Sequence, residues 1–143
     1  MDSLARAFAG DFADRGFAFA WVHLREPDLV GHKEGWMSPA YLAAVREADA
    51  ALGIVLRGIA ASPQAAQTAI IVTADHGGHE KVHWDGGDVD LLVPWLCIVP
   101  GVRGGALPQD VTVLDVPSTI LALLRLAPLT GGTPPVRACL ATR

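Results

Sequence analysis

The sequence predicts an α/β protein with a largely parallel sheet, and two observations carry that prediction. Helical patterns alternate with short apolar runs along the chain, which is typical of α/β layering. Polar loops rich in histidine directly follow two of the apolar runs, where the carboxyl ends of parallel strands hold ligands. With 143 residues, of which 51% are hydrophobic and 18% charged, the chain fits one domain with a sizeable core.

The first half of the chain contains two predicted helices around one predicted strand. Apolar residues recur every three to four positions over 2–15, which predicts an amphipathic helix. The apolar run 17–24 predicts a buried strand, and a loop rich in charge and glycine leads on to Ser38. Ser38 and Pro39 suit the N-cap and first position of a second helix, whose apolar face continues to about residue 60.

The second half adds two predicted strands and one helix. Residues 68–74 form a short apolar run typical of a buried strand. Residues 91–99 predict another strand, in which Pro94 favours an edge or bulged position. Asp115 suits the start of a last helix, and the tail 128–143, rich in Gly, Pro and Thr, predicts irregular structure.

The composition excludes several classes of function. A net charge of −4 gives no basic face for nucleic acid or an anionic membrane. The chain has no apolar run long enough to span a membrane, and its N-terminus does not resemble a signal peptide, so we expect a cytoplasmic location. The two cysteines, Cys97 and Cys139, are too few for a disulfide scaffold, and Cys97 is expected as a small buried residue.

Two short motifs combine carboxylate and imidazole, a ligand set of Zn²⁺, Mn²⁺ and Fe. Asp28 and His32 are four residues apart and can reach one ion across a single turn of chain. Asp75 and His76 follow the predicted strand 68–74 directly, and two glycines after them permit the chain to break there. Adjacent residues of an extended chain do not easily face one centre, so each can also serve a different ion.

Each motif alone has an ordinary explanation, because an Asp-x-x-x-His pair is common and an aspartate often caps a turn. The two motifs in this order are much more specific. Of the histidines that follow, His83 is the better candidate ligand and His79 is expected in the loop. Trp36 and Trp84 lie nearest to the motifs and are expected to contribute packing.

Four segments in this order resemble the C-terminal half of the alkaline phosphatase superfamily. They read HLREPDLVGHKEGWMSPAYLAAVREADAALG, IIVTADHGGHEKVH, VPWLCIVPGV and LDVPSTILALLRL. The chain is most similar to the branch of type I phosphodiesterase/nucleotide pyrophosphatase-like proteins, often called sulfatase-like, over roughly residues 15–128. The resemblance implies a three-layer α/β/α sandwich with a mostly parallel sheet, present here as an incomplete C-terminal half, so that 1–143 is one partial domain.

The resemblance also implies two divalent ions, with zinc expected before manganese, magnesium or iron. It assigns five metal ligands: Asp28, His32, Asp75, His76 and His83. One ion takes the Asp-x-x-x-His pair and a later histidine, for which His83 matches better than His79. The other ion takes the Asp-His pair.

The implied function is metal-dependent hydrolysis of phosphate esters. The family's Ser or Thr nucleophile lies upstream of these motifs and matches no residue here, so no catalytic residue is assigned. The expected partners are a small phosphate ester and either a missing N-terminal half or a second copy joined at an exposed sheet edge. An inactive metal-binding or interaction module is the main alternative, and a sulfatase or phosphoglycerate-mutase-like enzyme is another.

Overall fold

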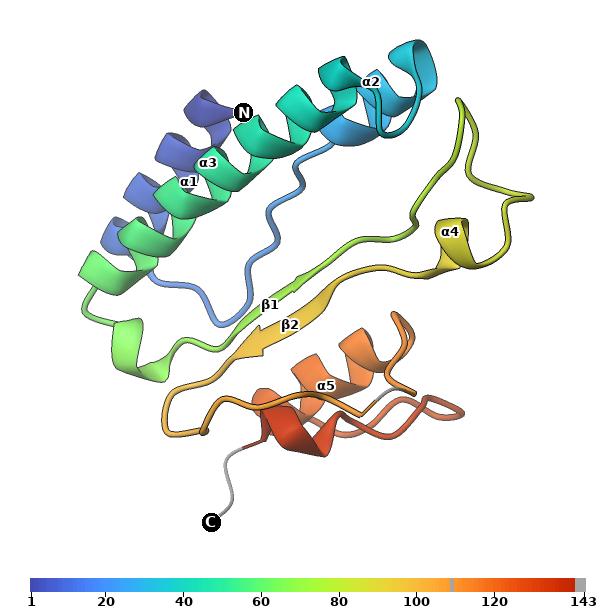
Figure 1. The fold of residues 1–143 in the computed structure, drawn as a ribbon. Coiled ribbons are helices and arrows are strands. Elements are labelled where there is room, and N and C mark those ends of the chain that lie inside the picture. Colours follow the sequence, from blue (N-terminus) through green and yellow to red (C-terminus); the bar gives the residue numbers. More distant parts are fainter. Residues whose placement is uncertain (109, 141–143) are drawn as a thin grey trace. The chain divides into compact units, whose positions relative to one another are not determined.

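The computed structural model describes residues 1–108 and 110–140 (Figure 1). The chain divides into two compact units, which are described separately below. Unit 1 comprises Met1–Ala66 and His76–Leu92, and unit 2 comprises Gln67–Asp75 and Val93–Arg143. That both units belong to one domain stays a prediction. Residues 141–143 of the expected irregular tail lie outside the described residues.

Unit 1 is built on two long helices, α1 (Asp2–Arg15) and α3 (Pro39–Ala61), which lie side by side (Figure 1). Both confirm the helices expected from the sequence. Small residues permit the close approach, because a Cβ on Gly58 of α3 would overlap Ala9 of α1. The buried apolar side chains of these two helices are Ala5, Phe12, Ala44, Ala51, Val55 and Ile59.

The start of α3 follows the predicted capping chemistry. Ser38 is the N-cap, and its Oγ accepts a hydrogen bond from the backbone N–H of Tyr41 at 3.1 Å. Pro39 occupies the first turn, where its missing N–H costs nothing because no helical partner exists there. The cap therefore fixes where α3 begins and where Tyr41 lies relative to the preceding loop.

The segment before Ser38 is not the loop that the sequence predicts. Residues Glu26–Glu34 form α2, with proline in the first turn and Gly35 at the C-terminal end with a positive φ of 94°. A helix repeats every 3.6 residues, so Asp28 and His32 lie one turn apart on the same face of α2. The helix thus achieves the juxtaposition that the four-residue spacing suggests.

The strand expected over 17–24 is absent from the structure. The segment is irregular, with a bend at 18–19, and no backbone hydrogen bond outside helices and strands involves it. Its aromatic residues Phe17, Phe19 and Trp21 are exposed. An apolar run becomes a strand only where a neighbouring strand pairs with its backbone groups, and within the described residues this run has no strand pairing.

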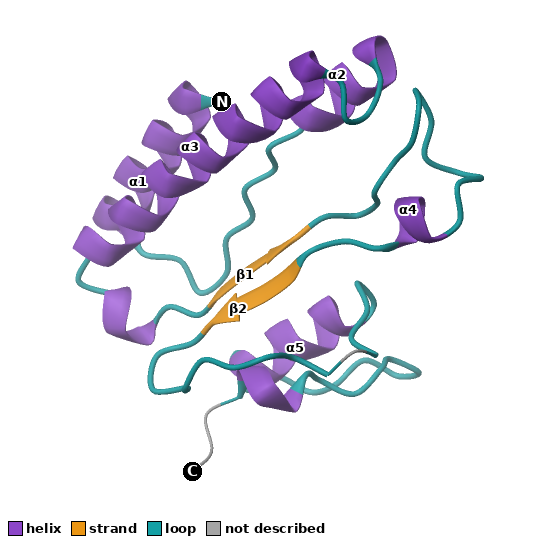
Figure 2. Ribbon diagram, viewed as in Figure 1, coloured by secondary structure: helices purple, strands orange, loops and turns teal. Residues whose placement is uncertain are grey.

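The expected three-layer α/β/α sandwich with a mostly parallel sheet is wrong for this structure. Within the described residues the sheet has two strands, β1 (Ile70–Thr73) and β2 (Trp95–Ile98), and they are antiparallel (Figure 2). Ile70 pairs with Ile98 and Thr73 with Trp95. Parallel pairing needs a crossover, usually helical. The connection from β1 to β2 contains only the four-residue α4 (Asp88–Leu91), so the chain returns antiparallel.

Unit 2 places α5 (Asp115–Leu123) against the C-terminal segment. The fully buried Thr119 Oγ1 donates to the Asp115 carbonyl at 2.7 Å and accepts from the Val136 N–H at 2.9 Å. The tail, which was expected to be irregular, contains one short 3₁₀ turn, Arg137–Cys139. A second 3₁₀ turn, Ala65–Gln67, lies far from the tail, directly before β1.

The two cysteines form a disulfide in unit 2, and the expectation of Cys97 as a small buried residue is wrong, because Cys97 is only partly buried. Cys97 of β2 bonds to Cys139, which is fully buried, across a sequence separation of 42. Two cysteines cannot make a disulfide scaffold, but a single bond needs only that their Cα atoms approach, here to 6.1 Å. Sequence spacing carries no information on that approach.

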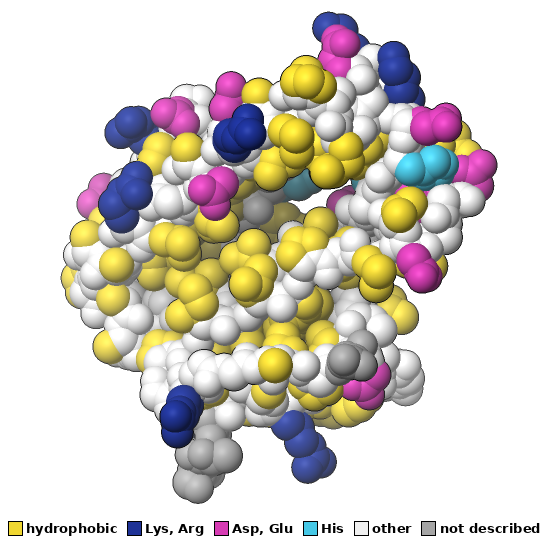
Figure 3. Space-filling model, in the orientation of Figure 1, with side chains coloured by type: hydrophobic (Ala, Val, Ile, Leu, Met, Phe, Trp, Pro, Cys, Tyr) yellow, Lys and Arg dark blue, Asp and Glu magenta, His cyan; other side chains and the backbone are white. Residues whose placement is uncertain are grey.

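Large apolar side chains reach the surface in many places, and hydrophobic side chains cover much of the face drawn in Figure 3. Exposed examples in unit 2 are Leu96 and Ile98 of β2, which alternate with less exposed neighbours. None of the helices in residues 1–108 and 110–140 is long and apolar enough to cross a bilayer.

Candidate metal centre

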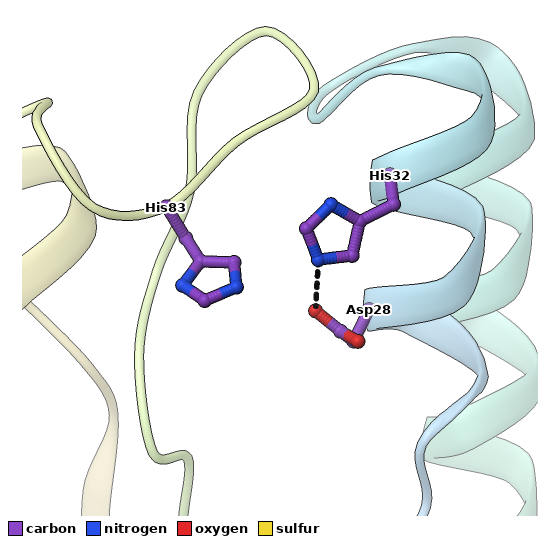
Figure 4. A group of neighbouring side chains, drawn as sticks. All are labelled: Asp28, His32 and His83. Carbon is purple, nitrogen blue, oxygen red and sulfur yellow. Dashed lines mark ion pairs between the residues drawn. The ribbon is translucent and has the colours of Figure 1, made fainter.

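Three of the five predicted ligands come together in unit 1. Asp28 and His32 project from adjacent turns of α2, and His83 faces them from the loop before α4 (Figure 4). Ligand atoms of all three lie within 4.8 Å of one another, and all three side chains are partly buried. One oxygen and two imidazole nitrogens are a donor set suited to a divalent transition metal.

The Asp28 carboxylate lies between two imidazoles. Its Oδ1 is 3.4 Å from Nε2 of His32 and 3.8 Å from Nε2 of His76. Both distances exceed the usual hydrogen-bond range of about 2.7–3.2 Å. The separation of 3.4 Å falls within that expected between ligands of a tetrahedral zinc, about 3.3–3.6 Å for bonds of about 2.0–2.2 Å. Asp28 Oδ1 is buried and has no hydrogen-bond partner among the described residues, so a cation would satisfy it.

Backbone carbonyls fix the tautomers of the two imidazoles. Nδ1–H of His32 donates to the Lys81 carbonyl at 2.9 Å, and Nδ1–H of His76 donates to the Gly77 carbonyl at 2.8 Å. A carbonyl can only accept, so in the neutral ring the lone pair is on Nε2, the nitrogen directed at Asp28. Metal-binding histidines are commonly oriented by such a bond from the other nitrogen. The residues present therefore fit a divalent cation.

His76 joins the same cluster through His83. The two rings stack with centroids 3.7 Å apart and an interplanar angle of 7°. His32 approaches His83 edge to face, with centroids 5.1 Å apart. The loop thus brings two histidines to the two ligands of α2.

Asp75 differs from the other four predicted ligands. It is exposed and belongs to unit 2, whereas the next residue, His76, belongs to unit 1. The assignment of Asp75 to a second ion stays a prediction.

His79 lies in a separate group. Its Nδ1 is 2.9 Å from Asp90 Oδ1 and its Nε2 is 3.2 Å from Asp85 Oδ1, while the backbone N–H of Gly86 donates to Asp90 Oδ2 at 2.7 Å. Asp90 is 4% exposed. Both ring nitrogens of His79 already face carboxylates, so this group ties the loop that carries His83 to the start of α4.

Charge and hydrogen bonding shift two pKa values in this group. The hydrogen bond to Asp90 raises the pKa of His79 above its ordinary 6.5, and the charges of Asp90, Asp85 and Glu80 add to the rise against partial desolvation. Burial acts to raise the pKa of Asp90, but the bonds from His79 and Gly86 hold it below its ordinary value. Both shifts favour the charged forms, so imidazolium beside carboxylate persists to a higher pH than in a free histidine.

The sequence predicted nothing for Tyr41, and only packing for Trp36. Tyr41 lies near enough to Asp28 for burial and then the carboxylate charge to raise the pKa of its phenol. The Trp36 ring lies 5.0 Å from that of His32 and 6.1 Å from that of Tyr41. The only sequence signal for either residue is its closeness to His32 and to the Ser38 cap.

Comparison with known proteins shows a family match. Residues 2–88 match the family described as type I phosphodiesterase / nucleotide pyrophosphatase. The matched range is more than half of the chain and includes α2, α3 and the loop with His76 and His83. No curated protein and no solved structure is significantly similar to the chain.

Proposed function

The chain belongs to the type I phosphodiesterase/nucleotide pyrophosphatase family, and from that premise we propose that it contributes a zinc centre to phosphate ester hydrolysis. Membership supports a phosphoesterase-type function and suggests divalent metals. The proposal assigns Asp28, His32 and His83 to one ion. The observation that carries it is the buried Asp28 Oδ1, which faces two imidazole nitrogens and has no hydrogen-bond partner among the described residues.

Zinc is proposed over the other metals because of the donor types. Two imidazoles and one carboxylate match the three-ligand pattern of catalytic zinc sites, which leaves a fourth position for substrate or water. Magnesium and calcium prefer oxygen ligands, which only Asp28 supplies here. Bound zinc would supply a Lewis acid for the oxygens of a phosphate ester.

The chain's own residues hold and orient that centre. α2 fixes Asp28 and His32 on one face, and the Lys81 carbonyl holds the His32 ring with Nε2 toward Asp28. Because the resemblance matches no serine or threonine of the chain to the nucleophile, these residues are assigned the metal centre and not the attacking group.

A second ion at Asp75 and His76 is part of the proposal. Its support is the family match, which covers both residues, together with the contact of His76 with the first cluster. We further propose a small phosphate ester as substrate, since the net charge of −4 offers no basic surface for a polymer of phosphates. The disulfide favours an oxidising compartment, so the expected cytoplasmic location is not part of the proposal.

The test measures zinc content and hydrolysis on the same samples. Chelator-treated protein is dialysed against buffered zinc, bound metal is counted by mass spectrometry, and hydrolysis of bis(p-nitrophenyl) phosphate is followed with a sulfate ester as comparison. His32→Ala should lose the ion and at least about a hundredfold of any activity. His23→Ala, which removes an exposed histidine outside the cluster, is the matched control.

Three outcomes distinguish the proposed function from its alternatives. Zinc binding lost in His32→Ala, together with zinc-dependent cleavage of the phosphodiester, supports the proposal. Because no residue of the chain is assigned as the nucleophile, zinc bound without turnover supports an inactive metal-binding module over a hydrolase formed by this chain alone. Equal zinc in His32→Ala and wild type overturns the metal centre.

A further inference from the structure

Two segments of unit 1 must meet for the metal centre to form, and Trp36 lies at their junction. α2 carries Asp28 and His32, and the loop carries His83. The Trp36 ring lies 5.0 Å from the His32 ring at 86° and 6.1 Å from the His83 ring at 61°. It contacts both histidines edge to face. The indole cannot itself be a metal ligand, since its N–H donates and it has no acceptor atom.

The indole of Trp36 packs against two glycines, one from each segment. A Cβ on Gly31 of α2 would come within 2.8 Å of the ring, and a Cβ on Gly78 of the loop would overlap it. Real Cβ atoms do not approach so closely, so neither position accepts a side chain while the ring stays in place. The ring therefore fills a slot with one wall from α2 and the other from the loop.

Backbone contacts bind the same two segments. The Trp36 N–H donates to the Glu80 carbonyl at 2.7 Å, and the Lys81 ammonium donates to the Lys33 carbonyl at 2.7 Å. Met37 and Glu80 both have positive φ, 63° and 45°, a region that non-glycine residues rarely adopt. Strained backbone of this kind persists where surrounding contacts hold it, and it gathers at functional sites.

We propose that Trp36 is a positioning residue whose indole, seated between Gly31 and Gly78, sets the separation of His32 and His83 and so the affinity for the divalent cation. The inference rests on the proposed metal centre. Trp36 does not touch the ion in this account. It acts through the two imidazoles, as residues outside the ligand shell commonly do.

The experiment titrates the full metal-free chain with Co²⁺, a spectroscopic substitute for zinc, by calorimetry and visible absorption. Trp36→Ala should weaken binding by about ten- to a hundredfold and change the ligand-field spectrum. Trp36→Phe keeps an aromatic edge and should stay within about threefold of wild type. Trp84→Ala is the matched control, because Trp84 also meets the His83 ring edge to face, at 5.5 Å, but is 70% exposed and fills no slot.

Gly78→Ala tests the slot without removing the ring. Its Cβ should displace the indole and weaken Co²⁺ binding about tenfold or more. In the Trp36→Ala background the space is open, so the same change should cost less than about twofold; such non-additivity is the signature of contact between the two positions. Should Trp36→Ala fail to fold, unchanged Co²⁺ affinity in Gly78→Ala alone overturns the inference.

A readout without metal completes the test. In metal-free protein, nuclear Overhauser contacts between the His32 and His83 rings should persist in Trp36→Phe and Trp84→Ala and be lost in Trp36→Ala. Wild-type affinity and spectrum in Trp36→Ala would overturn the positioning role and leave the metal centre standing. Absence of Co²⁺ and Zn²⁺ binding by wild type would overturn the metal centre and this inference with it.

Discussion

Asp28→Asn should remove about half or more of the stabilisation that zinc gives to the folded chain. Asparagine keeps the size of the side chain and one carbonyl oxygen. It removes the negative charge, whose Oδ1 lies 3.4 Å from Nε2 of His32 and 3.8 Å from Nε2 of His76. We expect zinc affinity to fall by at least about ten- to a hundredfold, since weaker changes outside the ligand shell already cost that much. The free-energy consequence follows from mass action.

Free zinc at a hundred times the wild-type Kd should stabilise the protein by about 2.7 kcal/mol. At the same zinc concentration a variant weakened ten- to a hundredfold would gain only about 1.4 to 0.4 kcal/mol. For a chain of this size the wild-type melting temperature should rise by about 10 °C, and that of the variant by about 1–6 °C.

The assay is circular dichroism during heating, at free zinc fixed by a metal buffer. Asp49→Asn is the control, because Asp49 is an exposed carboxylate on α3 in the same unit. It should show the full wild-type rise. A zinc-induced rise in Asp28→Asn equal to that of wild type would refute the role given to this carboxylate.

Three further predictions concern the scaffold. Cys97→Ser should lower the free energy of unfolding by about 4 kcal/mol in denaturant titrations, because the bond to Cys139 closes a loop with a sequence separation of 42; an unchanged midpoint in oxidised protein would contradict the bond. Ser38→Ala should cost about 1 kcal/mol in the same titration through loss of its cap hydrogen bond, and a neutral effect would contradict the cap. His79→Gln should destabilise the protein most between about pH 4 and 6.5. In that range the raised pKa of His79 and the lowered pKa of Asp90 both stabilise the folded state. The stabilisation from Asp90 is lost as the pH falls below about 4, and the stabilisation from His79 is lost as the pH rises past the pKa of His79 in the folded protein. A pH-independent effect would contradict the charged pair.

The helices were predictable because their signals are local. The pattern over 2–15 and the Ser38–Pro39 start of α3 depend on spacing and capping within a few residues, and the structure confirms both. α2 was not predicted because its short, charged sequence around Gly31 has no apolar face of the kind that indicates a helix.

The sheet was not predictable, because strand pairing depends on partners distant in sequence. Residues 17–24 have the composition of a strand but no backbone partner in the described part of the chain, and β1 pairs with β2 in the antiparallel sense. An apolar run indicates that a segment prefers burial. It does not indicate which segment it pairs with or whether the pairing is parallel or antiparallel.

The candidate site was predictable as a set of residue types more than as a geometry. Asp28, His32, His76 and His83 lie together in unit 1, whereas Asp75 belongs to unit 2 and its role as a ligand stays a prediction. The sequence favoured His83 over His79 without fixing the choice, because both follow the Asp-His motif within one loop. Their different surroundings arise from tertiary contacts, a buried Asp90 for one and α2 for the other.

The most direct test of the metal centre is anomalous diffraction at the zinc absorption edge from crystals of the full chain soaked with zinc. The account predicts a peak bonded at about 2.0–2.2 Å to the Asp28 carboxylate, Nε2 of His32 and the ring of His83. A well-ordered cluster with no peak, or a peak bonded to His79 and Asp85 instead, would contradict it.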